Sequence, residues 1–397
     1  MARVFIDGFE AGDLKLWNTI GAGAGLVAAA TGMDGSYCLH LASGGTTYYI
    51  QKTLPSNSEY YFAFRYRPSN DGSSRGMISF WSGGTLIGKL IRIGAAGLLV
   101  AYRGTTVIAT GTTPLAIDTT YLIEVRFKPA NSPDGVFHVK INGLLPLDIE
   151  FNGDSTDGAA TIDAVRLGHG DSASTNVYAY FDNLVVDNAA WPGNTKIQAI
   201  KPTGAGASSH SAWAADTVID LNEVRKPTVF NGFEYECTAR ADDFKTGAVE
   251  PVWGIVVGAT TDDDTNITWT CRVGAWNPST GDNYACVDEV PPSETDYVSL
   301  NHIGNVDTYA AGDLVGAIGS VKCVQVQALA KAEGEPTPTN LQLVLRSGGT
   351  DYVGSSHEVP NTNAAQLASI WVTDPATAAA WIESGINDME IGVKAVA

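Results

Sequence analysis

The chain has 397 residues, 44% of them hydrophobic and 17% charged, and its formal net charge at pH 7 is −19. This length and composition predict a globular protein with two or three domains. The negative charge repels nucleic acid phosphates and anionic membrane surfaces, so we expect no nucleic acid partner. No apolar run reaches the roughly 18–20 residues needed to cross a bilayer, so we expect no membrane insertion.

Residues 1–10 lead directly into strand-like sequence, without the apolar core and cleavage site of a signal peptide. The five cysteines are widely spaced and form no Cys-x-x-Cys pair, which argues against a disulfide framework or a zinc site. Cys237 and Cys271 are close enough in sequence to meet across a small sheet. Whether they pair is open, and buried free thiols are the favoured reading.

Residues 1–190 alternate with a period of two and show no helical periodicity. The clearest example is one strand face made by Tyr60, Phe62, Phe64 and Tyr66. The Asn142-Gly143 dipeptide is a strong hairpin signal, and Gly/Ser clusters separate the other strands. These patterns predict an antiparallel β-sandwich.

The two ends of this domain carry matching motifs. Phe5-Ile-Asp-Gly-Phe-Glu opens it, and Phe181-Asp-Asn-Leu-Val-Val closes it. In this respect the domain resembles the concanavalin-A/laminin-G-like jelly rolls, which include lectins, carbohydrate-binding modules and glycanases. The resemblance implies that the first and last strands lie side by side and that a glycan is a candidate ligand.

Glycan binding requires aromatic side chains beside polar groups on an accessible surface. The candidates are Trp81, Tyr102, His169 and Tyr178. The alternative for each is packing in the core, since Trp81 follows the apolar run 77–80.

A structural Ca²⁺ is a second hypothesis for this domain. Asp7, Glu10 and Asp182 come together if the terminal strands pair, and carboxylate oxygens suit Ca²⁺. The alternative is that Asp7 begins a turn and Asp182 ends a strand. No other cofactor is expected.

Catalysis by paired carboxylates is the weakest hypothesis. The glycanase branch of the resembled family carries Glu-x-Asp-x-Glu on one strand, and the nearest string here is Pro146-Leu-Asp148-Ile-Glu150. Pro146 stands where the first Glu belongs, so the nucleophile is missing. Solvated carboxylates at Asp148 and Glu150 are the favoured reading.

The breaker cluster at 188–194 marks the first domain boundary. Beyond it we expect a second β domain split into 194–212 and 276–397, with a small β module of residues 213–275 inserted. The run 262–264 is read as a solvated turn. Within 276–397, Asp374-Pro375 followed by Ala-rich sequence predicts one short helix near 374–384.

Two further resemblances come from this half. Residues 231–238 (Asn-Gly-Phe-Glu-Tyr-Glu-Cys-Thr), Glu250-Pro-Val-Trp and Thr268-Trp-Thr-Cys resemble a small module of bacteriophage tail and fibre proteins. Three later strings, at 276–298, 346–352 and 370–381, resemble a C-terminal domain of phage virion proteins.

These resemblances imply a bacteriophage virion structural protein of tail or baseplate type, assembled in the host cytoplasm, whose lectin-like domain attaches to a host-surface glycan. A purely structural capsid decoration or head-fibre protein is the alternative, and a glycanase the remote one. The sequence contains no Gly-x-Ser-x-Gly, phosphate loop or zinc spacing, so we expect no enzyme. The expected partners are other virion proteins and further copies of this chain, a trimer by analogy with fibres.

Overall fold

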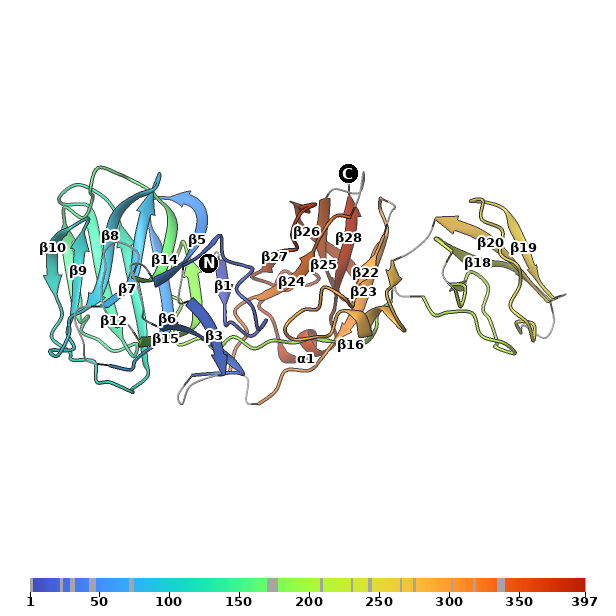
Figure 1. Cartoon of the computed structure of the whole chain (residues 1–397), viewed down its shortest axis with the longest axis horizontal. Helices are drawn as coiled ribbons and strands as arrows, with labels where there is room; N and C mark the ends of the chain where they lie inside the picture. The colour runs from blue at the N-terminus through green and yellow to red at the C-terminus, as the bar shows by residue number, and fades with distance from the viewer. Residues whose placement is uncertain are drawn as a thin grey trace. The chain divides into compact units, whose positions relative to one another are not determined.

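The computed structural model divides the chain into two compact units, Met1–Ala199 and Ile200–Ala397. It describes residues 3–21, 24–28, 33–42, 48–70, 75–169, 178–207, 210–229, 231–241, 245–264, 266–273, 276–300, 303–316, 319–333 and 340–396. Almost all regular structure is antiparallel strand, as predicted (Figure 1). Among these residues no helix is long and apolar enough to cross a membrane.

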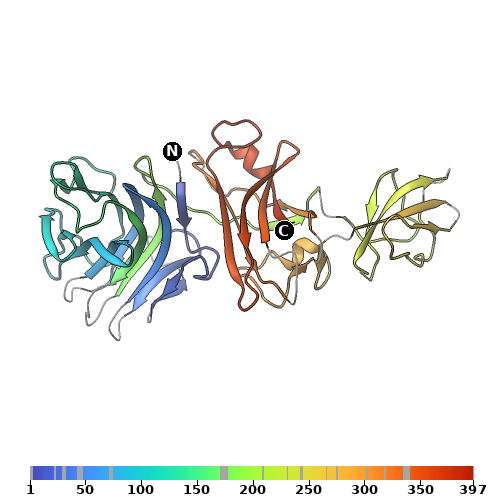
Figure 2. The same cartoon turned by 90° about the horizontal axis from the view of Figure 1, so that it is seen from above.

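Unit 1 is built from two antiparallel sheets, drawn from blue to green in Figures 1 and 2. The eight-stranded sheet runs β13 (Ile149–Gly153), β12 (Gly135–Ile141), β11 (Tyr121–Lys128), β6 (Tyr60–Pro68), β15 (Tyr178–Asp187), β4 (Tyr37–Ala42) and β3 (Ala24–Ala28), with β1 (Arg3–Asp7) also paired to β15. The seven-stranded sheet runs β10 (Thr106–Thr110), β9 (Leu99–Arg103), β8 (Thr85–Arg92), β7 (Arg75–Ser82), β14 (Ile162–His169), β5 (Tyr48–Asn57) and β2 (Thr19–Ile20).

The core of unit 1 lies between these sheets and is rich in phenylalanine. Phe62 and Phe127 from the eight-stranded sheet pack on Phe80 from the seven-stranded sheet, with ring centroids 5.0 and 4.6 Å away. All three side chains are fully buried. The alternation seen in the sequence therefore separates core from surface, which confirms the predicted sandwich.

The first and last strands of unit 1 lie side by side. β1 pairs with β15 in antiparallel register, with Arg3 opposite Asp187. The Arg3 guanidinium also donates to the Asp187 carboxylate at 3.0 Å, and both side chains are buried. This pairing closes the chain of unit 1 on itself.

Unit 2 contains a sheet whose strands come from both sides of residues 213–275. β16 (Pro202–Ala205) precedes that segment and pairs with β23 (Val306–Ala311), which follows it. The sheet continues through β28 (Glu390–Val396), β25 (Asn340–Ser347) and β26 (Thr350–Glu358). The remaining pairs are β24 (Val324–Ala330) with β27 (Ala365–Trp371), and β21 (Asn277–Pro278) with β22 (Val298–Ser299), and a 3-10 turn spans Asn283–Cys286.

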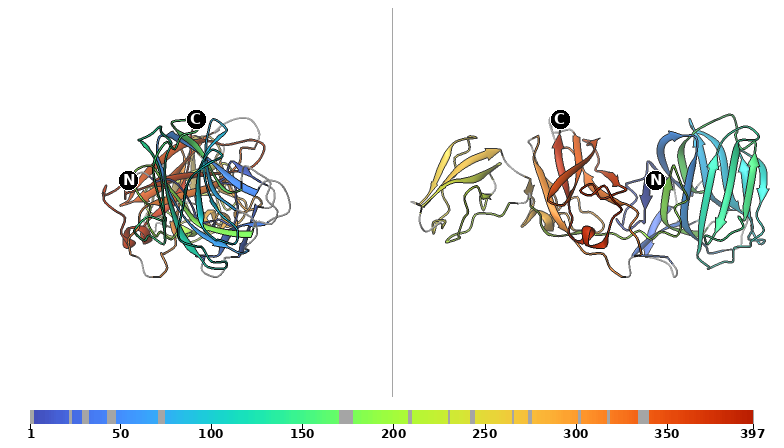
Figure 3. Two further views of the ribbon diagram at one scale, coloured as in Figure 1. Left: turned by 90° about the vertical axis from the view of Figure 1, so that its left-hand side faces the viewer. Right: turned by 180° about the vertical axis from the view of Figure 1, so that it is seen from behind.

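The described residues between 213 and 273 include a four-stranded sheet of their own, yellow in Figure 3. Its order is β17 (Val224–Arg225), β18 (Phe233–Arg240), β20 (Ile267–Val273) and β19 (Thr260–Asp263). Trp253 packs between Tyr235 and Trp269, with ring centroids 4.2 and 5.8 Å away. This cluster is the small aromatic core of the module.

The solvated turn expected at 262–264 is wrong for Asp263, which is fully buried. Its carboxylate accepts hydrogen bonds from the indole nitrogens of Trp213 and Trp269, at 2.6 and 3.1 Å, and from the Gly247 amide at 2.8 Å. Three donors compensate the burial of the charge. Asp263 therefore ties the two ends of the module to its centre.

The helix predicted near 374–384 is wrong in position, because α1 spans only Glu383–Asn387. The Asp374 carboxylate accepts from the Ala376 amide and the Ser347 and Thr377 hydroxyls. Ala378 has φ of 56°, which ends any right-handed turn. Local side-chain bonding thus replaces the expected first helical turn.

Cys237 and Cys271 are buried free thiols. They lie on adjacent strands but are not opposite one another, because Cys237 faces Trp269 and Cys271 faces Tyr235 in the register. Burial raises the pKa of both thiols.

Phe80→Ala should lower the free energy of unfolding of unit 1 by about 3–5 kcal/mol, since it removes a fully buried ring that contacts both sheets. Chemical denaturation of the full chain measures it. Val107→Ala, on the same sheet but 52% exposed, is the control and should change the value by less than about 0.5 kcal/mol. Equal effects of the two substitutions would contradict the assigned core.

Candidate functional site

One row of side chains crosses all seven strands of the seven-stranded sheet on its outer face. Because Phe80, Val165 and Leu90 point into the core, their neighbours in sequence point outward. Strand pairing places these neighbours opposite one another. The cross-strand row, from β10 to β2, is Val107, Tyr102, Lys89, Ser79, Arg166, Gln51 and Thr19.

Arg166 is the centre of this row. Its guanidinium carbon lies 3.5 Å from the centroid of the Trp81 ring and 4.3 Å from that of Tyr49. Its Nε donates to Gln51 Oε1 at 2.7 Å, and Trp81 Nε1 donates to Ser79 Oγ at 2.9 Å. The cation is therefore stacked on two aromatic rings, an arrangement that fixes all three side chains.

A second cation lies two strands away in the same row. Lys89 Nζ is 5.0 Å from the centroid of the Tyr102 ring. Lys89 and Tyr102 are direct cross-strand neighbours. Three half-buried aromatic rings and two cations thus share one face of one sheet.

The outer face of the eight-stranded sheet differs, because a segment of unit 1 runs across it. Trp191 contacts Tyr61 edge-on, at 5.6 Å between centroids, and Lys140 Nζ lies 3.9 Å from the Trp191 ring. Farther along, the Gly193 amide donates to Glu124 and the Ile197 amide to Asn183. Three arginines on this face are paired with carboxylates: Arg126 with Glu59, Arg67 with Asp118 and Arg65 with Asp34. The crossing segment and these ion pairs distinguish this face from the outer face of the seven-stranded sheet.

Two of the four predicted glycan-binding residues, Trp81 and Tyr102, lie on the outer face of the seven-stranded sheet. His169 and Tyr178 are the end residues of β14 and β15, and their side chains lie outside the described residues. The sequence reasoning missed Tyr49, Lys89 and Arg166. The sequence shows that side chains alternate within each strand. It does not show which strands are neighbours or which residues are opposite one another, and this pairing brings the three residues onto one face.

The three residues of the calcium hypothesis divide into two sets. Asp7 accepts from the Phe9 amide and Trp17 Nε1, both at 2.7 Å. Asp182 accepts from the Asp34 and Asn183 amides. Burial raises the pKa of Asp182 to about 7, with smaller contributions from Asp34 and Glu10, so Glu10 belongs with Asp182. In the described ranges no group of three or more His, Cys, Asp or Glu has metal-site geometry, and the calcium stays a prediction.

Asp148 and Glu150 occupy different surroundings. Asp148 Oδ1 accepts from the amides of Thr112 and Thr113, at 3.1 and 2.8 Å, so it holds the loop that precedes β11. Glu150 is exposed on β13, opposite His138. The prediction of a solvent-exposed carboxylate holds for Glu150. Asp148 instead stabilises a loop through its hydrogen bonds to Thr112 and Thr113.

No protein-family model matches the chain, and no curated protein matches it. Solved structures similar to it include an endo-β-1,4-glucuronan lyase from the fungus Trichoderma reesei, at 14% identity and TM-score 0.38 over 47% of this chain and 96% of that one. A PL-14 alginate lyase from Aplysia kurodai matches at 12% identity and TM-score 0.33, over 42% of this chain and 87% of the lyase. The carbohydrate-binding module CBM66 from Bacillus subtilis matches at 12% identity and TM-score 0.30, over 44% of this chain and 96% of the module.

These neighbours contradict the predicted function. They are polysaccharide lyases and a carbohydrate-binding module, and none of the three is a virion protein. A non-enzymatic virion structural protein, whether in tail, baseplate, capsid or head fibre, is therefore not carried forward. These neighbours do not test the separate expectations on enzymatic activity, location and trimer formation, which rest on the sequence alone.

The stability of unit 1 should fall as pH rises from about 4 to about 6, partly because of Asp7. Burial is the main cause that raises the pKa of Asp7 to about 6, and its two hydrogen bonds oppose the rise. The fold therefore favours the protonated form. Protonated Asp7 stabilises the fold fully below about pH 3.9, the pKa of an aspartate in the unfolded chain. This stabilisation is lost as the pH rises through about 6. For a difference of two pKa units it amounts to about 3 kcal/mol.

Asp7→Asn should flatten this fall, as measured by denaturant unfolding at a series of pH values. Asp134→Asn, at an exposed site of the same unit, should leave the wild-type profile unchanged. A profile that keeps its full slope in Asp7→Asn would refute the assignment to Asp7.

Proposed function

We propose that unit 1 binds carbohydrate chains on the outer face of its seven-stranded sheet. The observation that carries the proposal is the stack of Arg166 between Tyr49 and Trp81, in register with Lys89 and Tyr102. Aromatic rings present flat apolar surfaces to the C–H faces of sugars, and adjacent polar groups bond the hydroxyls. This face has both kinds of group.

The length of the cross-strand row favours a chain over a single sugar. The row spans seven strands, and with strands about 4.8 Å apart its ends are roughly 29 Å from one another. Its members on β9, β8 and β14 are aromatic or cationic, and Trp81 on β7 and Tyr49 on β5 lie beside it on the same face. The glycan-related names of the three solved structures agree with this proposal but do not carry it.

The bonded geometry also supports a preformed surface. Gln51 and Ser79 already hold Arg166 and Trp81 in place. A ligand that meets fixed side chains loses less of its affinity to ordering them. We therefore expect unit 1 to bind without rearranging its backbone.

Trp81→Ala in the full chain should weaken binding to soluble polysaccharides at least tenfold, or about 1.4 kcal/mol, because it removes the largest ring of the face. Affinity electrophoresis against a panel of neutral and acidic polysaccharides identifies a ligand, and calorimetry measures it. Tyr61→Ala is the matched control, since Tyr61 is an outward aromatic with its own cation, Arg126, on the other sheet. Loss of binding in Tyr61→Ala but not in Trp81→Ala would place the site on the eight-stranded sheet and refute the proposal.

A further inference from the structure

A buried lysine lies where the inserted module joins the rest of unit 2. Lys226 follows β17, and its backbone exchanges hydrogen bonds with Ser211 and Trp213 at the entry to the module. The residue is only 9% exposed. Burial of a lysine amine is costly unless the amine has polar partners, so its surroundings need an explanation.

The amine of Lys226 contacts the side-chain amide of Asn283. Lys226 Nζ lies 2.9 Å from Asn283 Oδ1, although the residues are 57 positions apart. This hydrogen bond places the amine beside the side-chain carboxamide whose carbon, Cγ, is the electrophile of an acyl transfer. To react, the amine turns from the oxygen toward Cγ, a movement within the same contact.

Asn283 is fixed in turn by two acceptors. Its Nδ2 donates to the Trp276 carbonyl at 3.0 Å and to Asp307 Oδ2. The Tyr309 hydroxyl donates to the same Asp307 oxygen at 3.0 Å. Asn283, Asp307 and Tyr309 are 5%, 2% and 4% exposed, so the group excludes most solvent.

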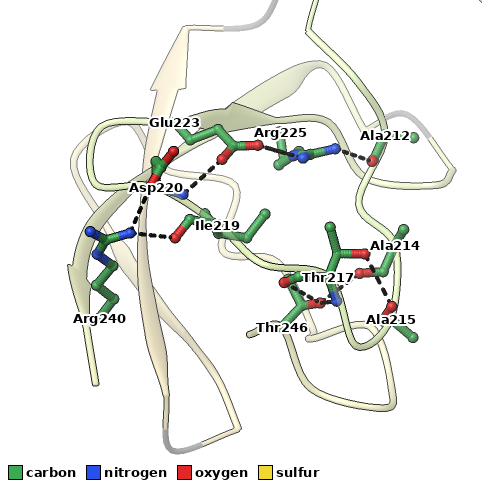
Figure 4. A network of polar contacts seen from close by, with 10 residues as sticks. All are labelled: Ala212, Ala214, Ala215, Thr217, Ile219, Asp220, Glu223, Arg225, Arg240 and Thr246. Carbon is green, nitrogen blue, oxygen red and sulfur yellow. Dashed lines mark hydrogen bonds and ion pairs between the residues drawn. The ribbon is translucent and has the colours of Figure 1, made fainter. Parts of the chain in front are cut away.

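The loop that carries Lys226 is held by its own polar contacts, drawn in Figure 4. Arg240 donates to the Ile219 carbonyl at 2.8 Å and to Asp220 at 2.9 Å. Arg225, beside Lys226, bonds Glu223 and donates to the Ala212 carbonyl. Lys226 therefore reaches Asn283 from a positioned backbone.

The surroundings of Lys226 shift its titration toward the nucleophilic form. Burial, the largest effect, lowers the pKa of Lys226, while nearby acidic groups, Asp307 first among them, act in the opposite direction. A desolvated lysine is a standard way to obtain an amine nucleophile near neutral pH. Asp307 contacts the amide nitrogen that would leave.

We propose that Lys226 and Asn283 form an intramolecular isopeptide bond, with Asp307 as the proton shuttle. The Lys226 nitrogen attacks Asn283 Cγ and forms a new C–N bond. Asp307 takes the proton that this nitrogen gives up and delivers it to the Asn283 amide nitrogen. The bond from Cγ to that nitrogen then breaks and ammonia leaves. The net reaction converts an amine and a primary amide into a secondary amide plus ammonia, with no oxidant, reductant or cofactor.

The roles follow from contacts. Lys226 is the nucleophile, Asn283 the electrophile, and Asp307 the group that touches the leaving nitrogen. Tyr309 is a positioning residue, because it touches only Asp307 in this group. The bond would join residue 226 of the inserted module to residue 283 of the split domain, and so cross-link the base of the insertion.

Intact mass of the purified full chain under denaturing conditions tests the proposal. The wild type should be lighter than its sequence by the mass of one ammonia. Peptide mapping must place the loss on a branched peptide containing Lys226 and Asn283, because succinimide formation at Asn142-Gly143, Asn152-Gly153 or Asn231-Gly232 gives the same mass change. The proposal is wrong if ammonia is lost only at those Asn-Gly dipeptides. It is also wrong if folded protein yields Lys226 and Asn283 only in separate, unbranched peptides.

Variants assign the roles. Lys226→Met and Asp307→Asn should each retain the full sequence mass, whereas Lys322→Met, at an exposed lysine of the same unit, should still show the cross-link. Circular dichroism establishes that the variants are folded. A folded Asp307→Asn protein that cross-links as completely as the wild type would remove Asp307 from the mechanism. The wild-type peptide map decides the bond itself even if a variant fails to fold.

Discussion

Register between hydrogen-bonded antiparallel strands is the constraint on which unit 1 depends. A shift by one residue would exchange inward and outward side chains along a strand. With the observed register, Phe80 and Val165 meet in the core while Ser79 and Arg166 meet on the outer face. The same pairing therefore generates both the buried aromatic cluster and the stacked surface. A change of register along β7 or β14 would therefore disrupt the core and the proposed carbohydrate site together.

Unit 2 contains two buried polar groups that join segments far apart in its sequence. Asp263 joins the indoles of Trp213 and Trp269 inside the module, and Asn283 joins Lys226 to Asp307 at its base. Such groups are stable only with complete bonding, which demands one specific geometry. Of the two, only the Lys226–Asn283 contact joins residues 213–275 to the rest of unit 2. The pairing of β16 with β23 across the insertion leaves the main sheet continuous.

Features that depend on neighbouring residues could be predicted from the sequence. The alternation at 60–66 correctly identified the side chains of one strand that face the core, and Trp81 and Tyr102 were identified as aromatic residues between turns. Arg166 was not identifiable, because its stacking partners lie 85 and 117 positions away and only the sheet brings them together (166 − 81 and 166 − 49). The Lys226–Asn283 contact has no sequence signature for the same reason. The predicted helix failed for a different reason. Asp374 was interpreted as a helix N-cap, but its carboxylate stabilises a turn instead.

The antiparallel pairing of β1 with β15 has a practical meaning for the way this sandwich can be handled. The first residue of β1 and the last residue of β15 are neighbours, with Arg3 directly opposite Asp187. A domain whose ends adjoin can be transplanted into a loop of another protein as a cassette. It is also open to circular permutation, with a short peptide joining the old ends and new ends cut at the exposed Asn142-Gly143 hairpin.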